Sequence, residues 1–253
     1  MNILFTICGR AGSKGIKNKN IREFCGYKLP LYTLSAIDLF LKQTKLNVKS
    51  DIVLNTDSLE LINILSNNKL RKIEIINRTA DLSGDVIGKI DVIKDCLTRM
   101  EDRKSTKYDI VVDLDITSPL RKISDIENII QKHIATKADV TTTVATSRRN
   151  PYFNQVKRTE HGFKKVIDSD FTSRQQAPKI FDLNASIYAY KPEYLKTGKG
   201  VLDGYVECVE MFDTGVLDLD HENDFEIMEV IADYLFNKYS DFSEIKNNLV
   251  KNN

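Results

Sequence analysis

The sequence predicts an α/β fold, in which a Rossmann-like, mainly parallel sheet carries helices on both faces. Up to residue 146, short apolar runs alternate with segments whose apolar residues recur at helical spacing. Strands that alternate with helices in this way form parallel sheets. After residue 146 the alternation stops for a polar stretch and then resumes. We therefore expect a single domain, residues 1–253, with a small excursion at about residues 147–182.

The first 146 residues provide the strands and helices of this alternation in order. The predicted strands are the apolar runs Ile3–Cys8, Asp51–Asn55, Lys72–Ile76, Asp109–Leu114 and Val140–Ala145. The predicted helices begin at Pro30, cover Ser58–Leu65, run from Val86 to Met100, and carry the stripe Ile126, Ile129, Ile130 and Ile134. Proline suits the first turn of a helix, and Ser124 is predicted to cap the last of the four.

The remainder of the chain departs from this pattern and then returns to it. Residues 150–180 are polar, lack a long helical period and contain a possible hairpin around Gly162. Ala185–Tyr190 is predicted to rejoin the sheet, and Cys208–Phe212 is a further short apolar piece. The last predicted helix carries Phe225, Met228, Ile231, Leu235 and Phe236. The polar tail, Lys246–Asn253, is expected to fray.

Charge balance and hydropathy exclude two classes of partner. The 253 residues include 37 Lys and Arg and 36 Asp and Glu, a formal net charge of +1, whereas a dedicated nucleic-acid binder carries a basic footprint. Apolar stretches fall short of the roughly 20 residues that a membrane span needs, and the N-terminus lacks the basic region of a secretory signal. We expect a cytoplasmic protein that binds neither nucleic acid nor membrane.

Cysteines and histidines show no metal-binding spacing. The cysteines form no C-x-x-C pair and are predicted to be free thiols of a reducing cytosol: Cys8, Cys25, Cys96 and Cys208. The histidines are predicted to lie at the surface or in loops without a zinc site: His133, His161 and His221.

The strongest local signal follows the first predicted strand. The stretch Gly9–Asn20, G-R-A-G-S-K-G-I-K-N-K-N, holds three glycines and four cations, and ligands of open α/β sheets bind at this end of the strands. Glycines let backbone N–H groups approach phosphate, and Arg and Lys neutralise it. The spacing matches neither G-x-G-x-x-G nor the P-loop. The stretch is predicted to bind phosphate, and a solvated basic turn is the alternative.

A second candidate lies near the end of the chain. Asp218 and Asp220 are separated by one residue, so on an extended segment both carboxylates point to one face. Such a pair suits Mg²⁺ together with phosphate oxygens. Glu222 and Asp224 follow and read as the acidic first turn of a helix. The residues alone leave open whether Asp218 and Asp220 bind metal or belong to a helix-capping acidic cluster.

Four motifs, in order, resemble those of the acylneuraminate cytidylyltransferases, the CMP-sialic acid synthetases. Gly9–Asn20 resembles their A-R-G-G-S-K-G-I-P-x-K-N, and Asp115–Arg121 (D-I-T-S-P-L-R) their Q-P-T-S-P-L-R. Arg174-Gln175-Gln176 with N-A-S-I-Y from Asn184 resembles R-Q-Q followed by N-G-A-I-Y, and D-L-D from Asp218 their D-I-D. One motif alone would be weak evidence, but the four together are specific and span residues 3 to about 232.

The resemblance implies a reaction and its participants. Such enzymes join a nine-carbon keto-sugar acid to CTP, releasing pyrophosphate, when the C2 hydroxyl attacks the α-phosphate. The resemblance implies Mg²⁺ as cofactor and a homodimer in which the excursion of one subunit reaches toward the neighbour's site. Fixed cations and a divalent metal are needed because both substrates are anionic.

The resemblance also implies residue roles. CTP binding is assigned to Arg10, Ala11, Gly12, Ser13, Lys14, Lys19, Asn20, Arg78, Ile87 and Lys89. Sugar binding is assigned to Asp115, Thr117, Ser118, Arg174, Gln175 and Asn184. Catalysis is assigned to Arg10, Lys19, Asp218 and Asp220, and the two aspartates hold the metal. A surface arginine is the alternative for Arg78 and a strand-edge residue for Asn184, while Pro119 is expected to end its strand.

Departures from the family pattern bear on the sugar. Asp115 stands where the family has Gln, and Lys89 where the sialate branch has a small hydroxyl residue near the base. Together with D-L-D at Asp113–Asp115 and the stretch Arg148–Asn154, they resemble the legionaminic-acid branch more closely. We therefore favour a legionaminate-type substrate over N-acetylneuraminate. An acidic group at position 115 would accept hydrogen bonds from a hydroxyl or amide, or bind metal.

Several alternatives stay open. Arg148 and Arg149 are candidates for binding a carboxylate in the neighbouring subunit's site, and a solvated basic turn is the alternative. Tyr152 and Phe153 are predicted to pack in the dimer contact. Another sugar nucleotidylyltransferase is an alternative within the class, and a non-catalytic nucleotide sensor is the alternative from a different class. The sequence shows no strong general base.

Overall fold

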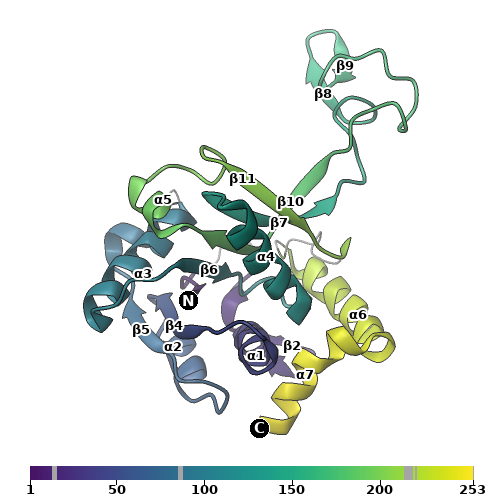
Figure 1. Cartoon of the computed structure of the whole chain (residues 1–253). Coiled ribbons are helices and arrows are strands. Elements are labelled where there is room, and N and C mark those ends of the chain that lie inside the picture. Colours follow the sequence, from purple (N-terminus) through teal and green to yellow (C-terminus); the bar gives the residue numbers. More distant parts are fainter. Residues whose placement is uncertain (13–15, 85–87, 214–218, 220, 253) are drawn as a thin grey trace.

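The computed structural model describes residues 1–12, 16–84, 88–213, 219 and 221–252, and places a seven-stranded sheet at the centre of the molecule (Figure 1). Its order is β11-β7-β10-β6-β1-β4-β5. The strands are β1 (Asn2–Cys8), β4 (Lys49–Thr56), β5 (Glu74–Asn77), β6 (Ile110–Leu114), β7 (Val140–Thr146), β10 (Phe181–Tyr190) and β11 (Val206–Glu210). Within this sheet β10 is antiparallel to β6 and β7, and the other neighbouring pairs are parallel. The predicted fold class is confirmed.

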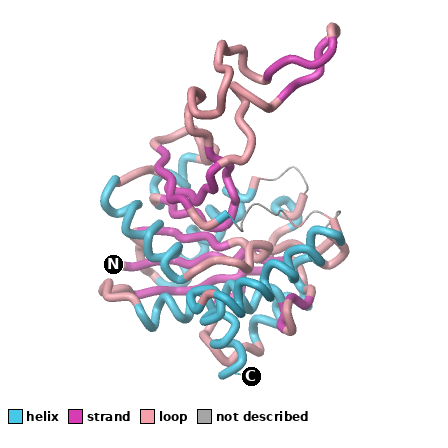
Figure 2. Tube along the Cα trace, turned by 90° about the vertical axis from the view of Figure 1, so that its right-hand side faces the viewer, coloured by secondary structure: helices cyan, strands magenta, loops and turns pink. Residues whose placement is uncertain are grey.

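Helices cover both faces of the sheet. The long helices are α1 (Leu29–Gln43), α2 (Leu59–Ser66), α3 (Lys89–Lys104), α4 (Ile123–Thr136), α6 (Glu222–Lys238) and α7 (Ser240–Asn252). Shorter elements are the 3-10 turns η1 (Lys19–Ile21) and η2 (Ala80–Leu82), helix α5 (Pro192–Thr197), and the small hairpin of β2 (Glu23–Phe24) and β3 (Tyr27–Lys28). Figure 2 shows the sheet between helices.

Alternation along the strands divides the core into two parts. Ile3, Phe5 and Ile7 of β1 belong to a core shared with α1, α2, α4, α6 and α7, whereas Leu4 belongs to a second core shared with α3 and α5. Successive side chains of a strand point to opposite faces, and both faces of a parallel sheet are buried. This is why β1 is apolar on both faces, with Thr6 as the one polar residue of its interior.

Residues 147–180 leave the sheet as an arm (Figures 1 and 2). The arm ends in a hairpin of β8 (Val156–Thr159) and β9 (Gly162–Lys165), as predicted. Gly162 makes the reversal with a φ of +97°, a left-handed conformation that glycine adopts without steric cost. The Tyr152 and Phe171 rings pack edge to face inside the arm, with centroids 6.2 Å apart.

Three local predictions are wrong. The tail does not fray, because α7 packs on α1: Leu249 is buried, and Asn248 Nδ2 donates to Asp38 Oδ2 at 2.9 Å. Ser124 does not cap α4. The helix starts one residue earlier, and the Asp125 carboxylate accepts from the N–H of Lys122, its N-cap, at 2.7 Å.

The third wrong prediction concerns His133, which is buried rather than at the surface. Its Nδ1 lies 2.9 Å from Thr141 Oγ1, and burial lowers the pKa of its ring to about 4. A buried neutral imidazole avoids the desolvation cost of a charge.

Within the part of the chain that the structure describes, no helix has the length and apolar character to cross a membrane.

Candidate active site

The loops that follow β1 and β6 meet helix α2 at one edge of the sheet. Gly9 lies at the contact, and its N–H donates to Asn55 O at the end of β4 (3.2 Å). A Cβ at this position would lie only 2.7 Å from both Ile116 Cδ1 and Leu61 Cδ2. Carbon atoms pack at about 3.5–4.0 Å, so the close approach of the three segments requires glycine.

Two side chains hold the backbone of the glycine-and-cation loop. Asp57 Oδ1 accepts from the Ala11 N–H at 2.7 Å, and Asn20 Nδ2 donates to Arg10 O at 3.1 Å. Ala11 and Gly12 are exposed, and Gly12 has a φ of +69°. Predicted CTP residues Ser13 and Lys14 lie outside the described residues, as does Ile87.

Arg78 lies at the same edge, beside the loop. Its Nε donates to Asn55 Oδ1 at 2.8 Å and its Nη2 to Asn55 O at 3.0 Å. Asn55 is buried and donates in turn from Nδ2 to Asp95 Oδ2 at 3.0 Å. The guanidinium is therefore oriented next to Gly9 by a strand residue, and its role toward the base stays a prediction.

The loop also contacts the segment that contains the predicted metal pair. Lys19 Nζ donates to Leu219 O at 2.6 Å, 200 residues away in the chain, and the Leu219 side chain is buried. Arg22 pairs with Glu222 and stacks over Phe225 at 4.6 Å. The N-terminal loop and the start of α6 are therefore adjacent.

Asp218 and Asp220 themselves lie outside the described residues. Around them, α6 begins at Glu222, and Asp224 Oδ2 accepts from the His221 N–H at 2.8 Å. Glu222 and Asp224 thus form the acidic first turn that the sequence predicts. Among the residues that are described, no group of three or more His, Cys, Asp or Glu forms a candidate metal centre.

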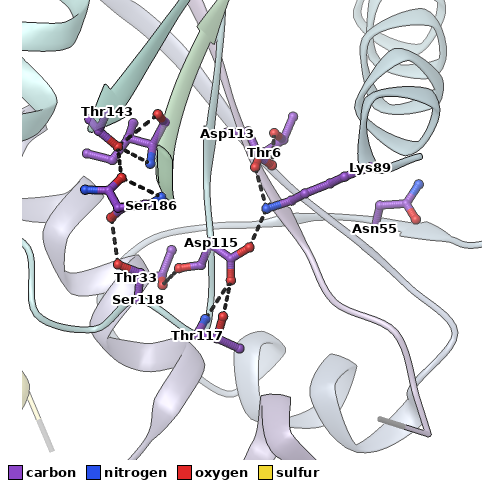
Figure 3. Close-up of polar contacts among 12 residues, drawn as sticks. Thr6, Thr33, Asn55, Lys89, Asp113, Asp115, Thr117, Ser118, Thr143 and Ser186 are labelled. Atoms are coloured by element: carbon purple, nitrogen blue, oxygen red, sulfur yellow. Dashed lines mark hydrogen bonds and ion pairs between the residues drawn. The ribbon is translucent and has the colours of Figure 1, made fainter. Parts of the chain in front are cut away.

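Four of the predicted sugar residues lie on β10 and in the loop after β6. Asp115 Oδ1 accepts from the Thr117 N–H and Oγ1 at 2.8 and 2.7 Å, and Ser118 Oγ donates to Ser186 Oγ at 2.7 Å (Figure 3). Asn184 is buried and accepts from Thr143 Oγ1 at 2.6 Å. It precedes Ala185, whose φ is +51°, within a register shift of β10. The bulge places Ser186 beside the loop after β6, where it contacts Asp115 and Ser118, since bulges redirect side chains; Asn184 contacts β7 instead.

The other two predicted sugar residues, Arg174 and Gln175, are exposed at the base of the arm. Arg174 Nη2 donates to Ser147 O at 3.2 Å and to Arg148 O. Arg148 Nε donates to Asp213 Oδ2 at 2.8 Å. Arg174, Arg148 and Asp213 line a cavity of about 460 Å³ together with Thr146, Asn150 and Lys179. Arg174 thus belongs with Arg148 rather than with the loop after β6.

Lys89 makes ion pairs that the sequence did not predict. Its Nζ lies 2.7 Å from Asp113 Oδ2 and 2.7 Å from Asp115 Oδ2. Burial alone would raise the pKa of the Asp115 carboxyl, but the Lys89 ammonium and the donors of Thr117 outweigh burial and lower this pKa to about 2. Asp115 is therefore ionised at neutral pH.

Sequence reasoning missed four polar residues that organise the site: Asn55, Asp57, Asp95 and Asp113. Two of them follow an apolar run within a strand. Asn55 follows the run in β4, and Asp113 follows the run in β6. A buried polar side chain requires a partner, so this pattern is a signal that could have found them. Asp57 and Asp95 stand in a loop and on a helix, where acidic residues carry no such signal.

Comparisons with known proteins show which proteins this chain resembles. A family model described as Cytidylyltransferase matches residues 4–238. A curated relative from Campylobacter coli, "Post-translational flagellin modification protein B", is 35% identical over 90% of this chain and 94% of its own length. A second, "CMP-N,N'-diacetyllegionaminic acid synthase" of Campylobacter jejuni, is 34% identical over the same shares.

A solved structure shares the fold. It is a CMP:2-keto-3-deoxy-manno-octonic acid synthetase complexed with CTP, which aligns with a TM-score of 0.67 at 15% identity. The alignment covers 92% of this chain and 99% of the other.

Proposed function

This chain belongs to the cytidylyltransferase family, and on that premise we propose that it transfers the cytidylyl group of CTP to a nine-carbon keto-sugar acid of the legionaminate type. The products are the CMP-sugar and pyrophosphate. The 34% identity to a CMP-N,N'-diacetyllegionaminic acid synthase supports this choice of substrate over N-acetylneuraminate.

One contact carries the proposal: Lys19 Nζ donates to Leu219 O at 2.6 Å. It brings the glycine-and-cation loop against the segment that contains Asp218 and Asp220. A phosphate-binding loop together with a pair of carboxylates is the combination that phosphoryl-transfer chemistry requires, because positioning and charge neutralisation provide most of the rate.

The reaction follows from the charges of the two substrates. CTP carries about four negative charges and the sugar acid adds a carboxylate, so cations must reduce the repulsion between them. Arg10, Lys19 and the backbone N–H groups of the loop hold the triphosphate, and Arg78 lies beside the nucleoside. The C2 hydroxyl oxygen of the sugar bonds to the α-phosphorus, the hydroxyl gives up its proton, and pyrophosphate leaves.

Mg²⁺ is the proposed cofactor, and the donor chemistry fits it. Asp218 and Asp220 are oxygen donors, which Mg²⁺ prefers, and Leu219 between them is anchored by its buried side chain and by Lys19. When bound, the metal supplies charge neutralisation at the phosphates.

Pyrophosphate release tests the function. With CTP and Mg²⁺ we expect release with legionaminate exceeding that with pseudaminate or neuraminate. We expect Asp220→Ala to abolish turnover but to leave the circular dichroism spectrum and the melting temperature near those of the parent. The matched control is Glu226→Ala, an exposed site on α6, which is expected to keep parental turnover. Full activity of Asp220→Ala would refute the metal assignment. CTP binding without turnover on any sugar acid would favour the nucleotide sensor.

We also propose that the arm forms a homodimer. Phe163 is 67% exposed and Val156 is 57% exposed on the β8–β9 hairpin, and an isolated two-stranded hairpin is marginally stable in water. A second copy of the chain would cover these side chains. Sedimentation velocity checks this proposal. We expect the parent to sediment as a dimer and Phe163→Lys to shift it toward monomer. A parent that sediments as a monomer would contradict the proposal.

A further inference from the structure

A lysine and two aspartates form a compact ionic cluster at the end of β6 (Figure 3). Lys89 Nζ lies 2.7 Å from a carboxylate oxygen of Asp113 and 2.7 Å from one of Asp115. The Asp113 side chain is fully buried, and its other oxygen accepts from Thr6 Oγ1 at 2.7 Å. Lys89 is 33% exposed and Asp115 is 23% exposed, so the cluster extends from the core to the site.

The position of Lys89 breaks a local rule. Lys89 is the first residue of α3, and a cation in the first turn of a helix opposes the macrodipole. Such a violation persists where other interactions compensate for it, commonly at functional sites. Here the compensation comes from Asp113, which faces α3 because residues of β6 alternate between the two sides of the sheet, and from Asp115 beyond the strand end.

Among the described residues, three hydrogen bonds reach the Asp115 carboxylate, which leaves about one acceptor position. Its Oδ1 accepts from the Thr117 N–H and Oγ1, and its Oδ2 accepts from Lys89. A carboxylate has about four acceptor sites. The Asp115 backbone is held as well, because its N–H donates to Ser186 O at 3.0 Å and its carbonyl accepts from Thr33 Oγ1 at 3.1 Å.

We propose that Lys89 is a positioning residue that orients the Asp115 carboxylate, and that Asp115 determines specificity by accepting a hydrogen bond from a hydroxyl or amide N–H of the sugar acid. This inference rests on the proposed function and changes the role of Lys89, which the sequence assigned to CTP. An ionised carboxylate only accepts hydrogen bonds, so the sugar must present a donor there. The Lys89 ammonium on Oδ2 also disfavours a metal at Asp115.

Ionisation of the cluster supports this role. Burial lowers the pKa of Lys89, but Asp113 and Asp115 reverse the effect and raise it well above its usual value. Removing the ammonium removes the main influence that keeps the pKa of Asp115 low. The other titratable and charged groups that interact with the cluster come from β1, β10 and the loop after β6: Cys8, Tyr188, Tyr190 and Arg121.

Steady-state kinetics of Lys89→Met test the proposal. We expect the KM for the sugar acid to rise about 10- to 100-fold, the range of one charge-assisted hydrogen bond, while the KM for CTP changes less than about threefold. The acid limb of the pH–rate profile moves upward, because a buried Asp115 beside Asp113 regains its proton more easily. Asp115→Asn reproduces the KM change without that shift in the acid limb.

Two further variants keep the test decisive. If Lys89→Met alone fails to fold, the double variant Lys89→Met/Asp113→Asn removes the buried carboxylate that Lys89→Met leaves unpaired. We expect this double variant to show the same rise in the KM for the sugar acid. Lys94→Met is the matched control one turn along α3; no acid that the structure describes pairs with Lys94, and we expect parental constants.

The outcomes separate the possibilities. A raised KM for CTP with an unchanged KM for the sugar would return Lys89 to the nucleotide and overturn the proposal. Rescue of Asp115→Asn by excess Mg²⁺ would make Asp115 a metal ligand and overturn it as well. No pyrophosphate release by the parent with any sugar acid would overturn the proposed function, and this inference with it.

Discussion

Replacing Gly9 with alanine adds a methyl group where the loop after β1, the loop after β6 and helix α2 meet. The new carbon would lie 2.7 Å from Ile116 Cδ1 and 2.7 Å from Leu61 Cδ2, with Asn20 Nδ2 at 3.3 Å. Both side-chain carbons are in the core, and each must retreat by roughly 0.8 Å to reach an ordinary carbon–carbon separation.

The displacement has a predictable cost. Overpacking a close-packed core costs about 1–3 kcal/mol, and about 1 kcal/mol lowers the melting temperature of a domain of this size by roughly 2–4 °C. Because Ile116 stands between Asp115 and Thr117, its retreat also disturbs the site. We expect Gly9→Ala to melt a few degrees lower and to raise the KM for the sugar acid by about tenfold.

Differential scanning fluorimetry and pyrophosphate-release kinetics measure the two effects. Gly88→Ala is the matched control, since a Cβ there would meet its neighbours at ordinary distances of 3.5 and 3.6 Å, and it is expected to change stability by less than about 1 kcal/mol. If Gly9→Ala matched Gly88→Ala in melting temperature and in KM, the close approach of the three segments would be refuted.

Three other predictions concern the site, the C-terminal helix and pH. Arg78→Lys cannot reproduce the two hydrogen bonds to Asn55, because lysine lacks the planar fork of arginine. We expect calorimetry to show CTP binding about tenfold more weakly. Unchanged affinity would contradict the placement of Arg78 beside the nucleotide. Leu249→Ala should lower the free energy of unfolding by about 2–5 kcal/mol in urea, whereas Val250→Ala, exposed on the same helix, should change it little; equal effects would mean that α7 does not pack as described. The pKa of His133 is lowered to about 4 in the folded chain. Below the unfolded value of about 6.5 the unfolded chain therefore binds more protons, and the free energy of unfolding falls as the pH drops toward 4. His133→Gln should flatten this fall in urea titrations at several pH values, and an equally steep fall would show that other groups cause it.

Much of the fold could be predicted because hydrophobic periodicity records burial directly. The interior of strand β1 is apolar except for Thr6 and is buried on both faces, while α1 shows its apolar spacing in full. The tail was mispredicted for the same reason: α7 is polar in composition, and its buried side consists of a few residues such as Asn248 and Leu249. Local composition does not reveal a partner helix that lies about 210 residues earlier in the chain.

The candidate site divides in the same way. The motifs of Gly9–Asn20 and Asp115–Arg121 identified the loops, since glycine, cations and carboxylates are needed for this chemistry wherever they lie. The partners within the site could not be predicted, because they join strands and helices far apart in sequence. The resemblance assigned Lys89 to CTP, whereas its partners Asp113 and Asp115 are more than twenty residues away in the chain.

The amino-acid sequence alone determined the α/β class, the order of strands and helices, the hairpin of the arm and the residue types available for binding phosphate, because each depends on neighbours along the chain. Tertiary structure alone decided which of these residues meet. It joined Lys19 to Leu219, placed Arg174 at the base of the arm beside Arg148, and turned Lys89 toward two aspartates. Such pairings depend on the register of the sheet and the packing of helices on it, which are set by the whole core rather than by any one segment.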